Sequence, residues 1–112
     1  MSSYEYQLSM WPAQRDQRDA LNDVLSAPRA VEHFAYFTRR GNAEAAADEL
    51  AAAGFAVGLG RRGFKTVLQA TRAESLGDDE VAQFLREAVS IVERNGGDYD
   101  GWGASVAAQS TA

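Results

Sequence analysis

The first thirty residues of the chain carry few apolar side chains, and their spacing predicts one short helix. Trp11-Pro12 is typical of a helix start, because proline at the first helical position sacrifices no hydrogen bond. Before it, alternating apolar residues fit either a short strand or a frayed terminal arm. We interpret residues 1–30 as an arm and helix that dock on a core. The alternating residues are Tyr4, Tyr6 and Leu8, and the apolar stripe of the helix, which ends before Pro28, is Ala20, Leu21, Val24 and Leu25.

The next segment predicts a strand followed by an alanine-rich helix. Residues 31–38 are dense in β-branched and aromatic side chains with apolar groups on both faces, which indicates a central strand. Asn42 is a good helix cap, and Gly54 predicts the end of the helix, with Phe55 folding back on Leu50. The apolar residues between them recur at helical spacing, at Ala43, Ala46, Ala47 and Leu50.

Three further elements complete the pattern. Residues 55–59 and 64–71 alternate on either side of Arg61-Arg62-Gly63, which predicts a β-hairpin with that tripeptide as its turn. Residues 78–95 begin with acidic residues and carry one apolar stripe, as a helix packed on a core does. A last strand follows over 98–106, and we expect 107–112 to be a mobile tail. The stripe of the helix consists of Val81, Phe84, Leu85, Ala88, Ile91 and Val92.

The order of these elements is a helix and then βαββαβ over residues 31–106. With right-handed crossovers this order predicts an α+β fold, a ferredoxin-like sandwich in which two helices cover one face of a four-stranded antiparallel sheet. In that topology the first two strands run in the same direction, so Arg39 and Arg40 converge with Arg61 and Arg62. This arginine end is either a network of solvated ion pairs, worth ~0 to 1 kcal/mol per exposed pair, or an anion or partner site. As an alternative function, the chain would bind single-stranded RNA or another anion at this end.

Composition and charge exclude several functions. The chain has no cysteine, which excludes disulfides, thiolate catalysis and cysteine-bound metals. No apolar run approaches the ~20 residues of a membrane span and the N-terminus does not resemble a secretory signal, so we expect a cytoplasmic protein. The net charge of −5 disfavours general affinity for nucleic acids and favours basic protein partners.

The residues that could carry chemistry do not form a catalytic pattern. His33 is the one histidine, and at a strand start we interpret it as structural. Asp98 and Asp100 are spaced as in a calcium loop, but the twelfth position of that loop is Gln109 rather than glutamate. The glycines of residues 58–63 have the spacing of a dinucleotide fingerprint but lie on a predicted strand and turn. We therefore expect no catalytic residue, metal or cofactor.

Three segments of the chain resemble the family called regulator of ribonuclease E activity B. They are residues 28–37, which include His33 and Phe34; residues 46–55, an alanine-rich helix that ends in Gly-Phe; and residues 96–102, the most specific of the three. The last segment reads Gly-Gly-Asp-Tyr-Asp-Gly-Trp and contains Tyr99, Asp100, Gly101 and Trp102. The resemblance implies a ferredoxin-like domain without catalytic residues that binds and inhibits the endoribonuclease initiating messenger RNA decay in some bacteria.

The partner that this resemblance and the acidic charge favour is a basic segment of a ribonuclease or of another RNA-processing protein. We expect Tyr36, on the open face of the sheet, to be an aromatic anchor, and Asp78, Asp79 and Glu80 to be acidic contacts. Phe34 and Tyr36 also occupy positions where RNA-recognition domains carry stacking aromatics. The third strand lacks the signature of those domains, so a core or protein-contact role is favoured over RNA stacking.

The last strand carries two large aromatic residues, Tyr99 and Trp102. Side chains alternate between the faces of a strand, and these two residues have opposite parity. We therefore expect only one of the two rings to face the helices and to anchor the strand in the core.

Overall fold

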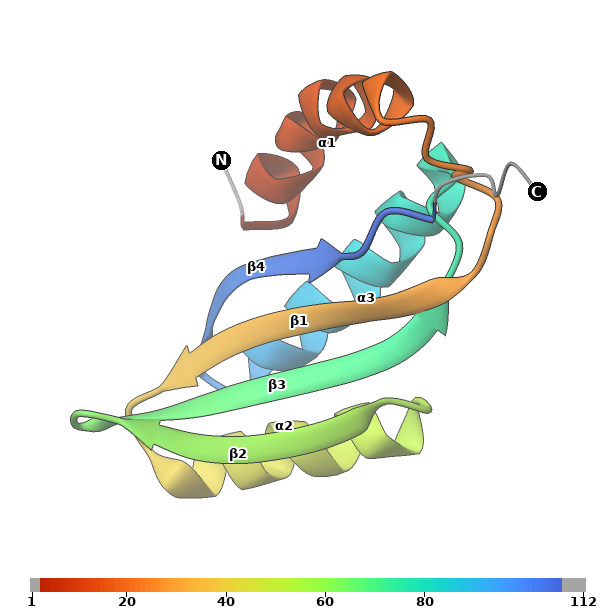
Figure 1. Cartoon of the computed structure of the whole chain (residues 1–112). Coiled ribbons are helices and arrows are strands. Elements are labelled where there is room, and N and C mark those ends of the chain that lie inside the picture. Colours follow the sequence, from red (N-terminus) through yellow and green to blue (C-terminus); the bar gives the residue numbers. More distant parts are fainter. Residues whose placement is uncertain (1–2, 108–112) are drawn as a thin grey trace.

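The computed structural model describes residues 3–107 of the chain, and three helices and four strands lie within them (Figure 1). The helices are α1 (Ser3–Ala20), α2 (Arg40–Ala52) and α3 (Asp78–Arg94), and the strands are β1 (Arg29–Phe37), β2 (Ala56–Arg62), β3 (Lys65–Glu74) and β4 (Asp98–Ala104). Apart from residue 107, the predicted mobile tail lies outside the described residues.

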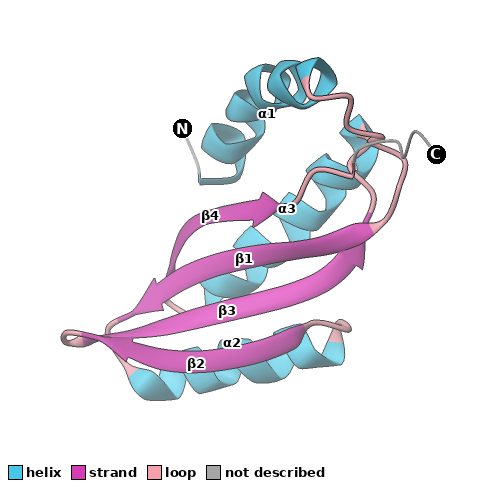
Figure 2. Cartoon of the chain, in the orientation of Figure 1, coloured by secondary structure: helices cyan, strands magenta, loops and turns pink. Residues whose placement is uncertain are grey.

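The four strands form one antiparallel sheet in the order β2-β3-β1-β4. Helices α2 and α3 lie on one face of this sheet, and no helix of the described residues covers the opposite face (Figure 2). Strand β1 is one of the two inner strands, and one of its faces is covered by the helices. Its alternate residues are therefore buried, which explains why it is rich in apolar side chains. The prediction of a ferredoxin-like α+β sandwich preceded by a helix is confirmed.

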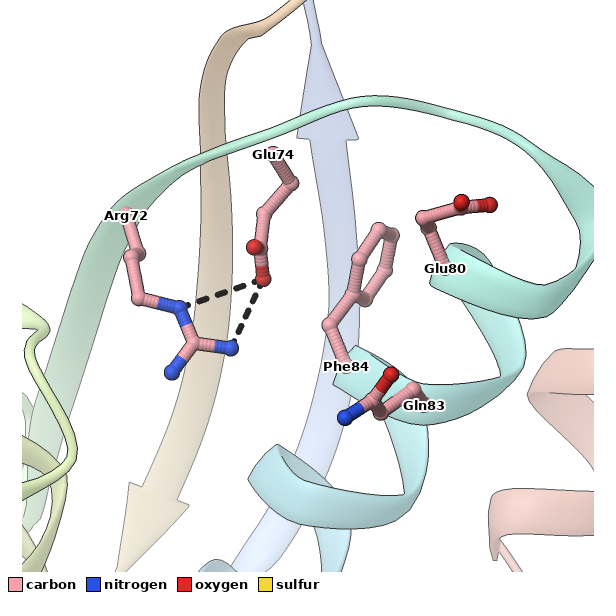
Figure 3. Close-up of a pocket in the computed structure, with 5 residues that line it drawn as sticks. All are labelled: Arg72, Glu74, Glu80, Gln83 and Phe84. Carbon is pink, nitrogen blue, oxygen red and sulfur yellow. Dashed lines mark hydrogen bonds and ion pairs between the residues drawn. The ribbon is translucent and has the colours of Figure 1, made fainter. Parts of the chain in front are cut away.

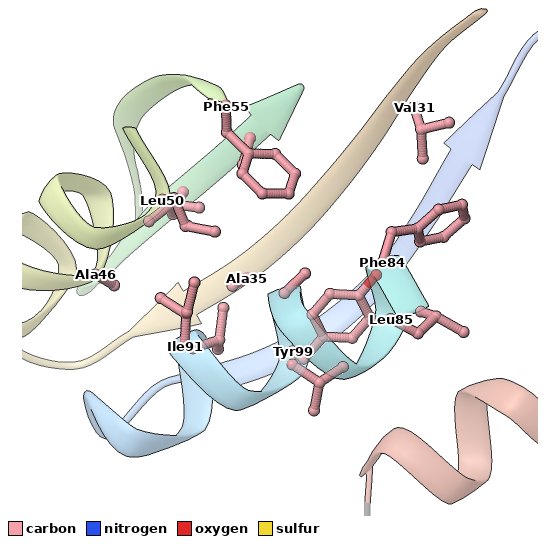
Figure 4. Packing of buried hydrophobic residues seen from close by; sticks show 14 of the residues in the cluster. Val31, Ala35, Ala46, Leu50, Phe55, Phe84, Leu85, Ile91 and Tyr99 are labelled. Carbon is pink, nitrogen blue, oxygen red and sulfur yellow. The ribbon is translucent and has the colours of Figure 1, made fainter. Parts of the chain in front are cut away.

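The core lies between the sheet and the two covering helices (Figure 4). The apolar stripe of α3 is buried as the spacing predicted. In α2, Ala43 and Ala46 are 0% exposed, so this helix approaches the sheet closely where a larger side chain would hold it away. Larger residues such as Phe37, Leu50 and Phe84 fill the layer, and burying each of them contributes about 1.5–3 kcal/mol.

Helix α2 begins earlier than the sequence predicted and ends where it predicted. Its N-cap is Arg39, which makes no side-chain capping hydrogen bond, so Asn42 lies inside the first turn rather than at the cap. At the other end, the amide of Phe55 donates to the carbonyl of Leu50 at 3.0 Å, and Phe55 is buried. The preference of asparagine for the N-cap position is worth only ~1 kcal/mol. The short connection from the end of β1 to α2 places Arg39 rather than Asn42 at that position.

The turn of the β2–β3 hairpin is Gly63-Phe64, not Arg61-Arg62-Gly63. Arg62 pairs with Lys65, so both arginines belong to β2. Gly63 has φ of 64°, a value that glycine adopts without strain and that a tight two-residue turn needs at its first position. Phe64, predicted to start the next strand, therefore lies at the tip of the hairpin.

Helix α1 is longer than predicted and ends sooner. It begins at Ser3, contains Pro12 in its interior and includes the N-terminal residues whose alternation fitted a strand or a frayed arm. The expected stripe fails, because Ala20, Leu21 and Val24 are exposed and Leu25 is only partly buried. The chain leaves the helix at Asn22, where φ is 58°, and this reversal turns Asp23 inward between two arginines.

Strand β4 contains a β-bulge that corrects the prediction for its two aromatic residues. Phe34 pairs with Gly101 and Ala35 pairs with Tyr99, so Asp100 is one residue too many for the register. Because of the extra residue, the side chains of Tyr99 and Trp102 both lie on the helix-covered face, where they pair with Ala35 and His33. Gly101, with φ of 148°, allows a backbone conformation there that other residues rarely adopt.

Candidate interaction surfaces

A buried ionic cluster joins the two ends of the domain. The Asp23 side chain is 0% exposed, and Arg29 Nη1 donates to its two oxygens at 2.6 and 2.8 Å, while Arg18 Nη1 donates at 3.0 Å. Both guanidinium groups also donate to backbone carbonyls after β4 or at its end, Ser105 and Ala104. Burial alone would raise the pKa of Asp23, but the hydrogen bonds from Arg29 and Arg18 outweigh it and lower the pKa. Arg18 Nε has no hydrogen-bond partner among the residues described, and the other contacts of the cluster hold α1, β1 and the end of β4 together.

His33 and Tyr99 form a second buried polar pair, on the helix-covered face. The His33 ring is 2% exposed, and a hydrogen bond of 2.7 Å joins its Nδ1 to the Tyr99 hydroxyl. The rings of Phe55 and Phe84 stand edge-on to the imidazole, with centroids 5.7 and 5.4 Å away. His33 Nε2 has no hydrogen-bond partner among the residues described. Burial, and to a smaller extent the charge of Arg72, lower the pKa of His33 to about 4.

We expect the free energy of unfolding to fall as the pH drops from 6.5 toward 4. The folded-state pKa of His33 is below its ordinary value of 6.5, so protonation favours the unfolded chain. The stabilisation is complete above pH 6.5, and a shift of this size corresponds to a loss of about 3 kcal/mol through that window. Urea unfolding of the wild type and of His33→Gln at several pH values measures it. Parallel pH profiles for the two proteins would contradict the assignment to His33.

Trp102 connects β4 with α1 and α3. Its ring lies 5.0 Å from that of Phe84 and 5.9 Å from that of Trp11, measured between centroids. The Trp11 indole in turn donates to Asp78 Oδ1 at 2.8 Å, and Arg15 forms an ion pair with the same carboxylate at 2.9 Å. Asp78, a predicted partner contact, therefore binds residues of the same chain, and these contacts connect the start of α3 to α1. Asp79 and Glu80 are exposed beside it.

The open face of the sheet carries two aromatic side chains flanked by glycines. Phe34 and Tyr36 lie on β1, and both are partly exposed. On β3 their direct neighbours are Gln69 and Val67, and beyond these the edge strand β2 carries Gly58 and Gly60. The other edge strand, β4, carries Gly101 and Gly103 on the same face. A Cβ atom added at any of the four glycines would meet nothing within 4 Å. The glycines are thus not required by close packing, and they leave the two edge strands without side chains at these four positions.

Acidic groups lie beside these aromatic rings. Glu32 is on the same face of β1, next to a hollow of about 300 Å³ lined by Ala30, Gly103, Ala104 and Ser105. Asp98 pairs with Tyr36 across β1 and β4, and the Tyr36 hydroxyl accepts a hydrogen bond from Arg62 at 3.3 Å. The acidic start of α3 follows the opposite end of β3, on the covered face (Figure 2). The structure therefore does not bring Tyr36 together with residues 78–80.

The structure brings together two of the four arginines that were predicted to converge, Arg40 and Arg61. Arg40 and Arg61 line one hollow of about 290 Å³ with Thr38, Phe64 and Thr66. Arg40 pairs with Glu44 at 3.1 Å, and both side chains are more than half exposed, so the pair contributes little to stability. Arg39 lies at the N-cap of α2, and Arg62 reaches the Tyr36 hydroxyl on the open face.

A smaller hollow, of about 120 Å³, lies between the end of β3 and the first turns of α3 (Figure 3). Arg72 and Glu74 point toward each other at its rim, and Phe84 and Gln83 line its other side. Arg72 donates to Glu74, to Glu87 and to the carbonyl of Ala53, and its guanidinium covers the Phe55 ring at 4.0 Å. With these contacts each guanidinium nitrogen of Arg72 has a partner. Glu80, which is exposed, lines the same hollow.

The family model described as Regulator of ribonuclease activity B matches residues 16–104, from the later part of α1 to the last residue of β4. The chain belongs to this family. A search of curated proteins gives no match. Membership in the RraB family confirms the resemblance drawn from the three sequence segments, and it implies a ribonuclease as the kind of partner.

Residues 96–102, the most specific of the three segments that resemble the RraB family, have a structural role. Gly97 lies against the Phe37 ring, where an added Cβ would come within 2.4 Å of a ring carbon. Tyr99 binds His33, Gly101 follows the extra residue of the bulge, and Trp102 packs on Trp11 and Phe84. The segment's repeated glycines and aromatics therefore fix the path of β4, and only Asp98 and Asp100 point to solvent.

Among residues 3–107, no three histidine, cysteine or acidic side chains gather as metal ligands would. In the same range, no helix is long and apolar enough to cross a membrane. Two features of the surface escaped the sequence reasoning: the exposure of Phe64 and the glycines beside Phe34 and Tyr36. The alternation of Gly58 with Gly60 and of Gly101 with Gly103 could have indicated the second, because each pair lies on one face of an edge strand.

Proposed function

We propose that this chain regulates a ribonuclease without catalysis, by binding the enzyme through the open face of its sheet. The observation that carries the proposal is the placement of Phe34 and Tyr36 at the centre of a face whose edge strands present glycine. Aromatic side chains in the middle of an accessible surface are the residues that most often anchor a protein interface. The target is the endoribonuclease that initiates messenger RNA decay.

On the β4 side of this face, opposite Arg62 of β2, the acidic side chains favour a basic segment of the ribonuclease. Glu32 and Asp98 border the aromatic pair on β1 and β4, and the hollow beside Glu32 has room for a long basic side chain. The net charge of −5 would speed the encounter with such a segment. At the acidic start of α3, Asp79 and Glu80 form a second, separate contact region in this proposal, since Asp78 is engaged with Trp11 and Arg15.

The noncatalytic part of the proposal rests on the position of the single histidine. His33 is enclosed by Phe55, Phe84 and Tyr99 under the helices, so it does not reach a macromolecular substrate. A general base must come within hydrogen-bond reach of the proton that it removes. The regulator is therefore expected to change the rate of another enzyme rather than to cut or modify RNA itself.

The test is an RNA-cleavage assay with the purified endoribonuclease of the source organism and increasing amounts of the purified chain. We expect the wild type to inhibit cleavage and the chain alone to leave the RNA intact. Phe34→Ala and Tyr36→Ala should each raise the half-inhibitory concentration roughly tenfold or more, as hot-spot residues do. Tyr6→Ala, which removes a ring that is 54% exposed on α1, should inhibit like the wild type.

The possible outcomes separate the parts of the proposal. Absence of inhibition by the wild type would reject the regulation of this enzyme, and RNA cleavage by the chain alone would reject the noncatalytic role. Equal inhibition by all variants would reject the open face as the contact. If Asp79→Asn with Glu80→Gln loses inhibition while the aromatic variants keep it, the contact lies at the start of α3 instead.

A further inference from the structure

The hairpin between β2 and β3 ends in a fully exposed phenylalanine surrounded by basic side chains. Phe64 is 98% exposed at the turn, which projects past the end of β1 at the left of Figure 1. Arg61, Arg62 and Lys65 are the adjacent strand residues, and Arg40 lines the same hollow as Phe64 and Arg61. Four of the eleven basic residues of the chain therefore lie in or beside this hairpin tip, and Arg39 precedes Arg40 at the N-cap of α2.

Phe64 has no structural task at this position. A side chain that is 98% exposed buries no apolar surface, so it does not stabilise the fold. The turn itself depends on Gly63, whose φ is 64°, and the position after it accepts many residue types. A single exposed apolar residue is ordinary on a protein surface, but this ring is the apex of a basic cluster. The combination, rather than the ring alone, indicates a binding function.

The basic charge of the tip is available for a ligand. Arg39, Arg61 and Lys65 form no ion pair within the part of the chain that the structure describes, and Arg62 contacts only a neutral hydroxyl. Arg40 forms an exposed pair with Glu44. The basic residues outside the tip are engaged in the fold: Arg18 and Arg29 with Asp23, Arg15 with Asp78, Arg72 with Glu74, Arg94 with Glu49 and Arg86 with Tyr4. The chain is therefore an acidic body with one basic tip.

We propose that the hairpin tip binds single-stranded RNA, with Phe64 stacking on a base and the surrounding arginines contacting phosphates. Guanidinium groups bind phosphate oxygens in pairs, and an aromatic ring stacks on any unpaired base. An acidic protein segment would use the charges but offers no flat partner for Phe64. A duplex would extend beyond the tip over the acidic body, which repels it. A short single strand satisfies both the ring and the charges.

The experiment measures fluorescence anisotropy of a labelled oligouridylate of about twelve nucleotides, a length within the usual site sizes for single strands, with the full chain at low salt. Phe64→Ala should weaken binding roughly fivefold to a hundredfold, as loss of one stacked base does. Arg61→Ala should weaken binding and make the slope of log affinity against log salt shallower by about 0.7. The matched controls are Tyr6→Ala and Arg86→Ala, an exposed ring and an exposed arginine outside the tip, which should bind like the wild type.

No binding by the wild type at low salt overturns the proposal, and so does equal weakening by the tip variants and their controls. Tighter binding of a duplex of the same length would also overturn it. An oligoglutamate peptide that displaces the RNA, combined with full affinity in Phe64→Ala, would show a general anion surface instead. Because the assay contains no ribonuclease, its result is independent of the contact proposed for the open face.

Discussion

Asp23→Ala is expected to lower the free energy of unfolding by about 3–5 kcal/mol. The substitution removes a carboxylate that is 0% exposed and leaves the Arg18 and Arg29 side chains, 10% and 4% exposed, without their counter-ion. Breaking a buried ion pair from one side costs this much because the remaining charge stays in a medium that solvates it poorly. Urea unfolding at pH 7 measures the loss.

The pH dependence of the same variant provides a second readout. The pKa of Asp23 is lowered from 3.8, so its contribution is complete above that pH and disappears as the pH falls through the lower folded-state value. The difference in free energy of unfolding between the wild type and Asp23→Ala should therefore become smaller at acidic pH. Asp19→Ala, an exposed aspartate on α1, should change stability by no more than ~0.5 kcal/mol. A loss in Asp23→Ala no larger than in this control would contradict the role of the cluster.

Tyr99→Ala is expected to cost about 3–5 kcal/mol, the usual range for removing a large aromatic ring from a core. The Tyr99 ring is 8% exposed, and its hydroxyl is the partner of the buried His33 Nδ1. The variant would create a cavity under α3 and leave both nitrogens of the imidazole without a partner. Denaturant unfolding followed by far-ultraviolet circular dichroism measures the change.

Two further variants separate the ring from its hydroxyl. Tyr99→Phe keeps the packing and removes only the hydrogen bond to His33, so we expect a smaller loss, about 1–3 kcal/mol. Tyr6→Ala, which removes a tyrosine ring that is 54% exposed, should be close to neutral. Equal stabilities for Tyr99→Ala and Tyr6→Ala would show that β4 is not held by this contact.

Part of the candidate site could be predicted from the sequence. The arginines of residues 39–40 and 61–62 were expected to converge. In the predicted topology β1 and β2 run in the same direction, so both strands finish at the same end of the sheet. Tyr36 was expected on the open face, because strand parity on β1 alternates without interruption. The occupation of Asp78 by Trp11 and Arg15 was not predictable, since the contacts join residues 67 and 63 positions apart in the chain.

The sequence by itself determined the order of the elements, the helix-facing stripe of α3 and the antiparallel ferredoxin-like sheet. Hydrophobic periodicity encodes which side of each element is buried, and chain connectivity with right-handed crossovers leaves few ways to assemble them. The register of β4 was decided only by the tertiary structure: one extra residue between the partners of Phe34 and Ala35 places both Tyr99 and Trp102 on the helix-covered face, where only one of the two rings was expected. The end of α1 was decided in the same way, since Asp23 turns inward to charges on another element. Bulges and buried ion pairs depend on contacts between distant residues, and local sequence patterns do not contain that information.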